Sequence, residues 1–136
     1  MTSPWILSAL VGVGGFFGSL ARYSLSIISQ RLSIEWPLGT MAANVLGCLV
    51  IGIIAELSAR GETLSPEVRL FLATGFCGGF TTMSSMIYET AEMLRASEYL
   101  HATVYAAGSF LLSMVAFFVG ISAVRVLVKM GGGLWN

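Results

Sequence analysis

The apolar residues of this chain are gathered into four long segments, and most of the charged residues lie in the breaks between them. The segments cover about residues 5–28, 38–55, 68–94 and 101–128. Each has the roughly 17 to 25 or more residues that a helix needs to cross about 30 Å of hydrocarbon. The pattern predicts an all-α integral membrane protein. Residues 1–136 then form a single transmembrane domain of four membrane-spanning helices, expected in the inner (plasma) membrane.

The residues at the segment ends agree with this prediction. Ser65, Pro66 and Glu67 have the order of an N-cap, a first helical position and a first-turn acid, so a helix is expected to begin there. Aromatic side chains that anchor helices at the membrane surface are expected at Trp5, Trp36, Tyr99 and Trp135.

The composition supports a membrane protein and argues against several other classes. Of the residues, 56% are hydrophobic and 10% are charged, against about 25% charged in a typical soluble domain. The formal net charge is zero, so no nucleic-acid partner is expected. Cys48 and Cys77 lie in apolar segments without the spacing of a zinc site or a disulfide framework, and we interpret them as free packing thiols.

The basic residues give little indication of which side of the bundle faces the cytoplasm. With four spans, one side carries Arg60, Arg69, Arg125 and Lys129, and the other carries Arg22, Arg31 and Arg95. Either the chain inserts both ways, so that two oppositely oriented copies pair about a two-fold axis, or it has too few charges for the positive-inside rule to work. Four short helices also enclose almost no interior, so a pore would need a partner copy.

Small residues four apart recur along the segments and predict close helix packing, within the chain or between copies. These pairs are Gly14 and Gly18, Gly15 and Ser19, Ala43 and Gly47, and Ala116 and Gly120.

The stretch GGFTTMSSM, residues 78–86, places two glycines and four hydroxyl residues near the middle of the third segment. Glycine weakens a helix, and threonine and serine offer competing hydrogen bonds. We therefore expect a break near the bilayer midplane, where freed carbonyls attract a cation. In an antiparallel dimer, two carbonyls from each chain would form a four-oxygen site that suits a structural Na⁺. The alternative is a tight helix crossing permitted by glycine.

Several other polar residues lie within the apolar segments. Arg22 is either a snorkelling side chain near a helix end or a positive charge at the floor of a wet vestibule that attracts anions. Asn44 either makes an interhelical hydrogen bond or points its amide donors at an anion. Tyr105, Ser109 and Ser113 share one face of the fourth helix and form a track of hydroxyl donors, unless the serines bond back to their own helix.

No arrangement of residues in the sequence indicates an enzyme. The single histidine, His101, has no metal-ligand partner near it in sequence, and the acidic residues are scattered along the chain.

Three stretches, in this order and register, resemble the Fluc/CrcB family of fluoride channels. They are GGFFGSLARY (14–23), PLGTMAANVLG (37–47) and TGFCGGFTTMSSM (74–86). The resemblance implies an antiparallel, dual-topology homodimer in the lipid bilayer that passes fluoride passively down its gradient and lowers cytoplasmic fluoride. It also implies a structural Na⁺ at the dimer centre, held by the backbone carbonyls of Gly78 and Thr81 from each subunit.

The resemblance further implies two fluoride paths, lined by Asn44, Ser109 and nearby hydroxyls. The full predicted pathway comprises Asn44, Thr82, Met83, Met86, Tyr105, Ser109 and Ser113, with Arg22 as the vestibule charge.

One departure from the family pattern concerns Met83 and Met86. The family usually has two phenylalanines there, and their weakly positive ring edges can face an anion. A thioether sulfur is a weak acceptor, although its polarised methyl group can face an anion and the side chain is flexible. Ser85 also stands where the family pattern, TTFSTF, has a threonine before its second phenylalanine. We expect the pathway to survive with an altered rate or selectivity.

Two other functions are compatible with four apolar spans. A small multidrug resistance-type, proton-coupled exporter is also a four-span, dual-topology dimer, but it needs a membrane-centred glutamate in the first span, where this chain has none. A structural helper subunit would need neither the break in the third span nor the hydroxyl track.

Overall fold

The computed structural model describes residues 3–31, 36–60 and 64–132, and every element in these ranges is a helix. Four helical stretches are long and apolar enough to cross a membrane, which confirms the expected all-α fold. The elements are α1 (Pro4–Gln30), α2 (Leu38–Ala59), α3 (Pro66–Arg69), the π-helix η1 (Leu70–Cys77), α4 (Gly78–Phe80), α5 (Met83–Arg95) and α6 (Tyr99–Gly132). The third span is built from α3, η1, α4 and α5 in succession.

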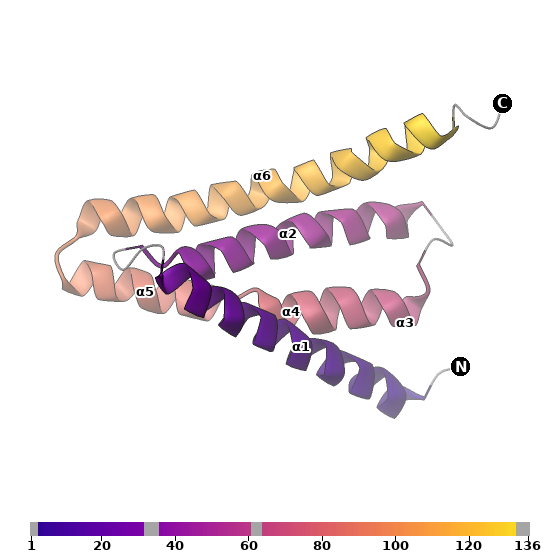
Figure 1. Cartoon of the computed structure of the whole chain (residues 1–136), viewed down its shortest axis with the longest axis horizontal. Coiled ribbons are helices and arrows are strands. Elements are labelled where there is room, and N and C mark those ends of the chain that lie inside the picture. Colours follow the sequence, from indigo (N-terminus) through magenta and orange to yellow (C-terminus); the bar gives the residue numbers. More distant parts are fainter. Residues whose placement is uncertain (1–2, 32–35, 61–63, 133–136) are drawn as a thin grey trace.

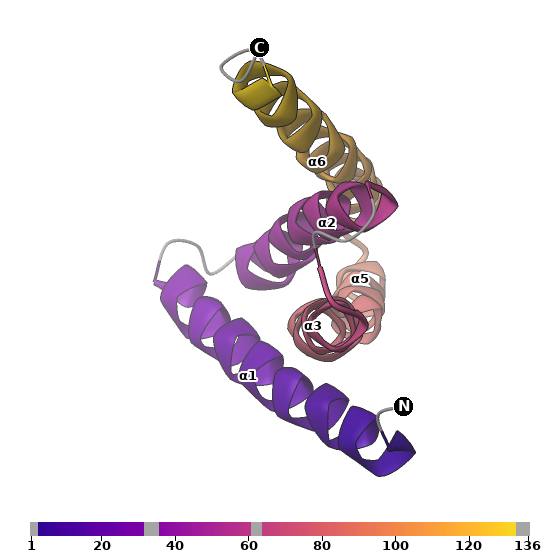
Figure 2. The ribbon, with the colours of Figure 1, turned by 90° about the vertical axis from the view of Figure 1, so that its right-hand side faces the viewer.

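The four spans run roughly along one axis, and the first turn of α1 lies at the same end of the molecule as the last turn of α6 (Figure 1). Helix α2 lies between its neighbours, with α6 on one side and the third span on the other (Figure 2). Helix α1 crosses the third span obliquely on the side away from α6 (Figures 1 and 2). The fold is therefore an open layer of helices with no enclosed centre.

Helices α2 and α6 extend about one turn beyond the expected ends, because polar residues there pair with one another. Glu56 is buried and forms ion pairs with Arg60 at 2.9 Å and with Arg125 of α6 at 3.1 Å. These contacts hold the last turns of the two helices together, so the charged residues continue the helices instead of ending them.

The third span breaks at Thr81 and Thr82, as the sequence predicted, but not at the glycines. Gly78 and Gly79 stay helical in α4, whereas Thr81 (φ −82°, ψ 154°) and Thr82 (φ −153°, ψ 114°) are extended. The threonine side chains satisfy both helix ends. The Thr81 hydroxyl donates to the Cys77 carbonyl at 2.9 Å, and the Thr82 hydroxyl accepts from the Ser85 N–H at 3.2 Å as the N-cap of α5.

Gly79 instead permits the crossing of α1 over the third span, so the alternative interpretation of a tight crossing is correct for this glycine, whereas Gly78 has open space around it. A Cβ added at Gly79 would meet the carbonyl of Gly15, and one added at Gly18 would meet the carbonyl of Phe76. The neighbouring segment Leu70–Cys77 is a π-helix, which the sequence did not predict. The backbones approach so closely here that no side chain fits between them.

Small residues serve packing within the chain at the other helix pair as well. A Cβ at Gly120 of α6 would meet the Leu49 carbonyl of α2, and one at Gly52 would meet the Phe117 carbonyl. Gly47 lies against the methyl group of Thr81, which brings α2 up to the break.

The helix start expected at Ser65 is found, whereas membrane anchoring by Trp5, Trp36 and Tyr99 stays a prediction. Ser65 caps α3 by accepting a hydrogen bond from the Val68 N–H at 3.3 Å, with Pro66 at the first position. The ring of Trp36 packs edge-on against His101, with the ring centroids 5.3 Å apart. Trp135 lies outside the described residues.

Candidate functional site

The break in the third span is held open by Asn44 of α2. Its amide nitrogen donates to the Thr82 carbonyl at 3.0 Å, and its carbonyl oxygen accepts from the Thr82 N–H at 2.7 Å. The interhelical hydrogen bond that the sequence allowed is therefore present, and it is two bonds instead of one. The bond to the carbonyl uses only one of the two amide hydrogens, so the second hydrogen remains able to donate.

The end of α4 leaves carbonyl groups without helical partners, and Arg22 reaches one of them. Arg22 Nε donates to the Gly79 carbonyl at 3.1 Å, and the Ser19 hydroxyl approaches the same oxygen at 3.5 Å. Within the described part of the chain, no hydrogen bond reaches the carbonyl oxygens of Gly78 or Thr81. Arg22 is thus fixed to the third span by its guanidinium, and its vestibule role stays a prediction.

A groove of about 470 Å³ opens beside the break, and we call it the central groove. Its walls come from α2, the break, α5 and α6, and are formed by Asn44, Cys48, Ile51, Thr81, Met83, Met86, Ser109, Phe110, Ser113, Met114 and Phe117. Five residues of the predicted pathway line it together, namely Asn44, Met83, Met86, Ser109 and Ser113. None of the lining side chains carries a formal charge, so the groove is apolar with a few hydrogen-bond donors.

Ser109 is the most unusual polar residue in the central groove. Its side chain is only 1% exposed, yet its hydroxyl has no hydrogen-bond partner among the described residues. Serine in an apolar helix ordinarily donates to the carbonyl one turn earlier. The Ser109 hydroxyl makes no such bond, so the back-bonding alternative is wrong for this residue. A buried hydroxyl without a partner costs about 1–3 kcal/mol, so this hydroxyl is available to donate to a ligand or a water molecule.

Tyr105 and Thr82 do not line the central groove, although the sequence placed them on the pathway. Tyr105 is 1% exposed, and its hydroxyl donates to Glu89 Oε2 at 2.5 Å. The other oxygen of Glu89 accepts from the Thr40 hydroxyl at 2.7 Å. Thr82 is occupied by capping α5 and by the bonds to Asn44.

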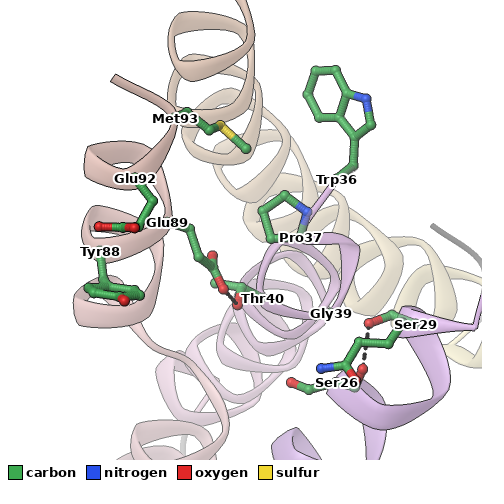
Figure 3. A pocket seen from close by; sticks show the side chains of 11 residues that line it. Ser26, Ser29, Trp36, Pro37, Gly39, Thr40, Tyr88, Glu89, Glu92 and Met93 are labelled. Carbon is green, nitrogen blue, oxygen red and sulfur yellow. Dashed lines mark hydrogen bonds between the residues drawn. The ribbon is translucent and has the colours of Figure 1, made fainter. Parts of the chain in front are cut away.

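Glu89 and Thr40 also line a second cavity of about 650 Å³, which we call the end pocket (Figure 3). Its walls include Ser26, Ser29, Trp36, Pro37, Tyr88 and Glu92, and Glu89 points across it toward Thr40 (Figure 3). Thr40 lies one turn before Asn44 on α2, and Tyr105 lies one turn before Ser109 on α6. The Thr40–Glu89–Tyr105 cluster therefore lies between the end pocket and the central groove.

The sequence analysis missed Glu89 and Thr40 as site residues. Thr40, Asn44 and Cys48 recur every four residues on α2, and that spacing was the available signal for Thr40. Helical spacing after the break places Glu89 on one face with Thr82 and Met86, but its partners Tyr105 and Thr40 come from other helices, and no spacing in the sequence indicates that contact.

The described residues contain no cluster of three or more His, Cys, Asp or Glu side chains that could hold a metal ion. His101 lies at the start of α6, exposed, with its Nδ1 3.4 Å from a carboxylate oxygen of Glu98.

Comparison with known proteins identifies the family of this chain. The family model described as "CrcB-like protein, Camphor Resistance (CrcB)" matches residues 9–121. A protein of Prosthecochloris aestuarii called "Fluoride-specific ion channel FluC" is 46% identical over 117 residues, which cover 86% of this chain and 91% of that protein. Proteins of the same name are 48% identical over 111 residues in Chlorobium phaeobacteroides (82% of this chain, 86% of that protein) and 44% identical over 124 residues in Rhizobium etli (90% and 99%).

The match includes the second and third spans, most of the first and fourth, and every residue that lines the central groove. The chain is a multi-pass membrane protein that belongs to the CrcB family.

Proposed function

We propose that this protein is a fluoride-selective ion channel that lets fluoride leave the cell down its gradient. The observation that carries the proposal is the buried, unpartnered hydroxyl of Ser109 in the same uncharged groove as the free amide hydrogen of Asn44. The relatives named as fluoride-specific channels match 86% and 82% of this chain. The pathway residues themselves remain part of the proposal.

The chemistry of the central groove suits a small anion that has lost its water. Fluoride is strongly hydrated, so it enters only where hydrogen-bond donors replace water, and Asn44, Ser109 and Ser113 supply such donors. The remaining walls are apolar and leave no acceptor charge to repel the ion. The groove also has no positive side chain that would hold the ion tightly. An ion passes through a channel only where it is bound weakly enough to leave.

A flux measurement tests this function directly. Liposomes loaded with potassium fluoride and containing only this protein are treated with a potassium ionophore, and the fluoride that leaves is followed with a selective electrode. We expect rapid fluoride efflux without a proton gradient and none of chloride from matched liposomes. Fluoride efflux no faster than from protein-free liposomes would contradict the proposal.

The exporter alternative has no support in the first span. Helix α1 contains no acidic residue, and its one charged side chain, Arg22, has the wrong sign for a lipophilic cation. Proton-coupled cation uptake into the same liposomes would nevertheless revive it.

The proposed channel is a homodimer of two oppositely oriented copies that meet at the break in the third span. Gly78 supports this arrangement, because it is exposed at mid-span and a Cβ there would meet nothing within 4 Å in its own chain. The described helices also leave the central groove open to the surroundings, so lipid or a second copy is needed to close it (Figure 2).

Dual orientation is tested by labelling from the two sides of the membrane. Met130 lies near the end of α6 and is 68% exposed, so a Met130→Cys variant in a background with Cys48→Ala and Cys77→Ala carries one accessible thiol. An impermeant maleimide should label about half of the protein in intact cells and the rest after permeabilisation. Labelling from one side only would contradict the antiparallel dimer.

The carbonyl oxygens of Gly78 and Thr81 fit a structural Na⁺ shared by the two copies, because they are hard oxygen acceptors without other partners in the described chain. Such an ion would supply a fixed positive charge beside the anion path. We expect the dimer to melt at a lower temperature after exhaustive dialysis into N-methylglucamine buffer, and to recover with Na⁺. An unchanged melting temperature together with no bound sodium by elemental analysis would contradict this site.

A further inference from the structure

The central groove contains an unusual number of sulfur atoms for its size. Four of its eleven lining residues carry sulfur, namely Cys48 on α2, Met83 and Met86 on α5, and Met114 on α6. The chain has seven methionines in all, and three of them line this one groove. Sulfur therefore approaches the groove from three helices.

The spacing of these residues places their side chains on the faces that form the groove. Cys48 follows Asn44 by four residues on α2, and Met86 follows Met83 by three on α5, so each pair shares a helix face. Met114 directly follows Ser113, and both line the groove. The thiol and the thioethers thus face the same space as the amide of Asn44.

Thiolate and thioether sulfurs are the ligands that soft monovalent metals prefer over oxygen ligands. Methionine is unbranched and flexible, so its sulfur can move to a metal without a change in the backbone. The unpartnered hydroxyl of Ser109 in the same groove is a second indication that something binds there. No lining side chain carries a positive charge that would repel a cation.

We propose that the central groove is also a binding site for a soft monovalent metal ion, Ag(I) or Cu(I), held by the Cys48 sulfur and the thioethers of Met83 and Met86. The Cys48 thiol loses its proton to solvent when the metal–sulfur bond forms, and no oxidation or reduction takes place. The bound metal occupies the space that the proposed fluoride path needs, so it blocks the channel. The predicted inhibition of fluoride passage rests on the proposed channel function, but the predicted metal binding does not.

Binding is measured with Ag⁺ alone on the purified protein in detergent, in nitrate buffer free of chloride, by isothermal titration calorimetry. We expect a site that Cys48→Ser weakens at least tenfold, and that the double variant Met83→Leu, Met86→Leu weakens by a smaller factor. Met130→Leu is the matched thioether control outside the groove, and it should leave the affinity unchanged.

Cys77 is the necessary thiol control. It is buried and close enough to Cys48 to interact with it electrostatically, but it does not line the groove. Cys77→Ser should retain Ag⁺ binding. Binding that survives Cys48→Ser, or that is lost equally in Cys77→Ser or Met130→Leu, would overturn the proposed site.

Flux separates the metal site from the channel function. Ag⁺ should inhibit fluoride efflux from liposomes, and the inhibited fraction should fall when Cys48 is replaced, each variant being compared with its own metal-free rate. Absent efflux before any metal is added would contradict the proposed function and leave the binding result valid. Tight Ag⁺ binding with undiminished efflux would overturn the block.

Discussion

The side-chain amide of Asn44 pairs with both backbone groups of Thr82, donating to its carbonyl at 3.0 Å and accepting from its N–H at 2.7 Å. A broken helix exposes backbone N–H and C=O groups that need hydrogen-bond partners in a bilayer, where each unsatisfied group costs several kcal/mol. Asn44 satisfies both groups of one residue and keeps one amide hydrogen for the groove. The same side chain therefore stabilises the break and supplies a donor beside it.

Asn44→Asp tests both roles. A carboxylate can still accept from the Thr82 N–H, but it cannot donate to the Thr82 carbonyl, and it places a negative charge beside the groove. We expect fluoride efflux to fall at least tenfold, with the variant still eluting as the parent does in size-exclusion chromatography. Efflux at the parental rate would remove Asn44 from the mechanism.

Met83→Phe tests the departure from the family pattern. Met83 lines the groove and is 68% exposed, so a larger ring fits without displacing packed neighbours. Because a phenyl edge is weakly positive, we expect fluoride efflux to be preserved or faster, whereas the control Met83→Leu supplies neither a ring edge nor a sulfur and should be slower. Loss of transport in a folded Met83→Phe protein would mean that the thioether has a specific role.

Ser109 and Tyr105 should respond differently to loss of their hydroxyl groups. The Ser109 hydroxyl has no partner among the described residues, so Ser109→Ala should leave stability unchanged or raise it while lowering fluoride efflux. The Tyr105 hydroxyl donates to Glu89, so Tyr105→Phe should destabilise the protein by about 1–3 kcal/mol, since the half-buried carboxylate loses its donor from the buried tyrosine. Thermal melting and efflux measured side by side check the contrast. Equal effects of the two variants on fluoride efflux would contradict the assignment of a pathway role to Ser109 and a structural role to Tyr105.

Gly78→Ala tests the dimer contact. An added Cβ meets nothing within the chain, so the monomer fold should be unaffected, but a second copy at this face would be pushed away. We expect weaker dimerisation in detergent, measured by dilution and chemical crosslinking. Gly12→Ala is the matched control, because Gly12 is also an exposed helical glycine with open space around its Cβ. Equal dimerisation of both variants would place the contact elsewhere.

Ser97→Gly should stabilise the turn between α5 and α6. Ser97 has φ 62°, and its N–H and that of Glu98 bond to the carbonyls of Leu94 and Met93, which is a Schellman motif. A non-glycine residue in this conformation costs roughly 1–2 kcal/mol, so glycine should raise the melting temperature. The neighbouring Ala96 has an ordinary φ of −76°, and Ala96→Gly should lower the melting temperature.

Much of the fold could be predicted because the membrane imposes a strong one-dimensional pattern on the sequence. Apolar length marked the four spans, and Ser65 with Pro66 marked a helix start. The position of the break was predicted to within a few residues. The prediction attributed it to the glycines, whereas Thr81 and Thr82 form it, because their hydroxyls make hydrogen bonds to backbone groups at both helix ends.

The sequence by itself determined that the chain is a four-span helical membrane protein with hydroxyl and amide donors at mid-span. Only the tertiary structure decided which donors are free, because hydrogen bonds between helices depend on how the helices cross. In the described structure the Tyr105 hydroxyl donates to Glu89, whereas the Ser109 hydroxyl has no partner, although both residues lie on one face of α6. Periodicity places side chains on a face, but only the packed neighbours decide what each side chain can still bind.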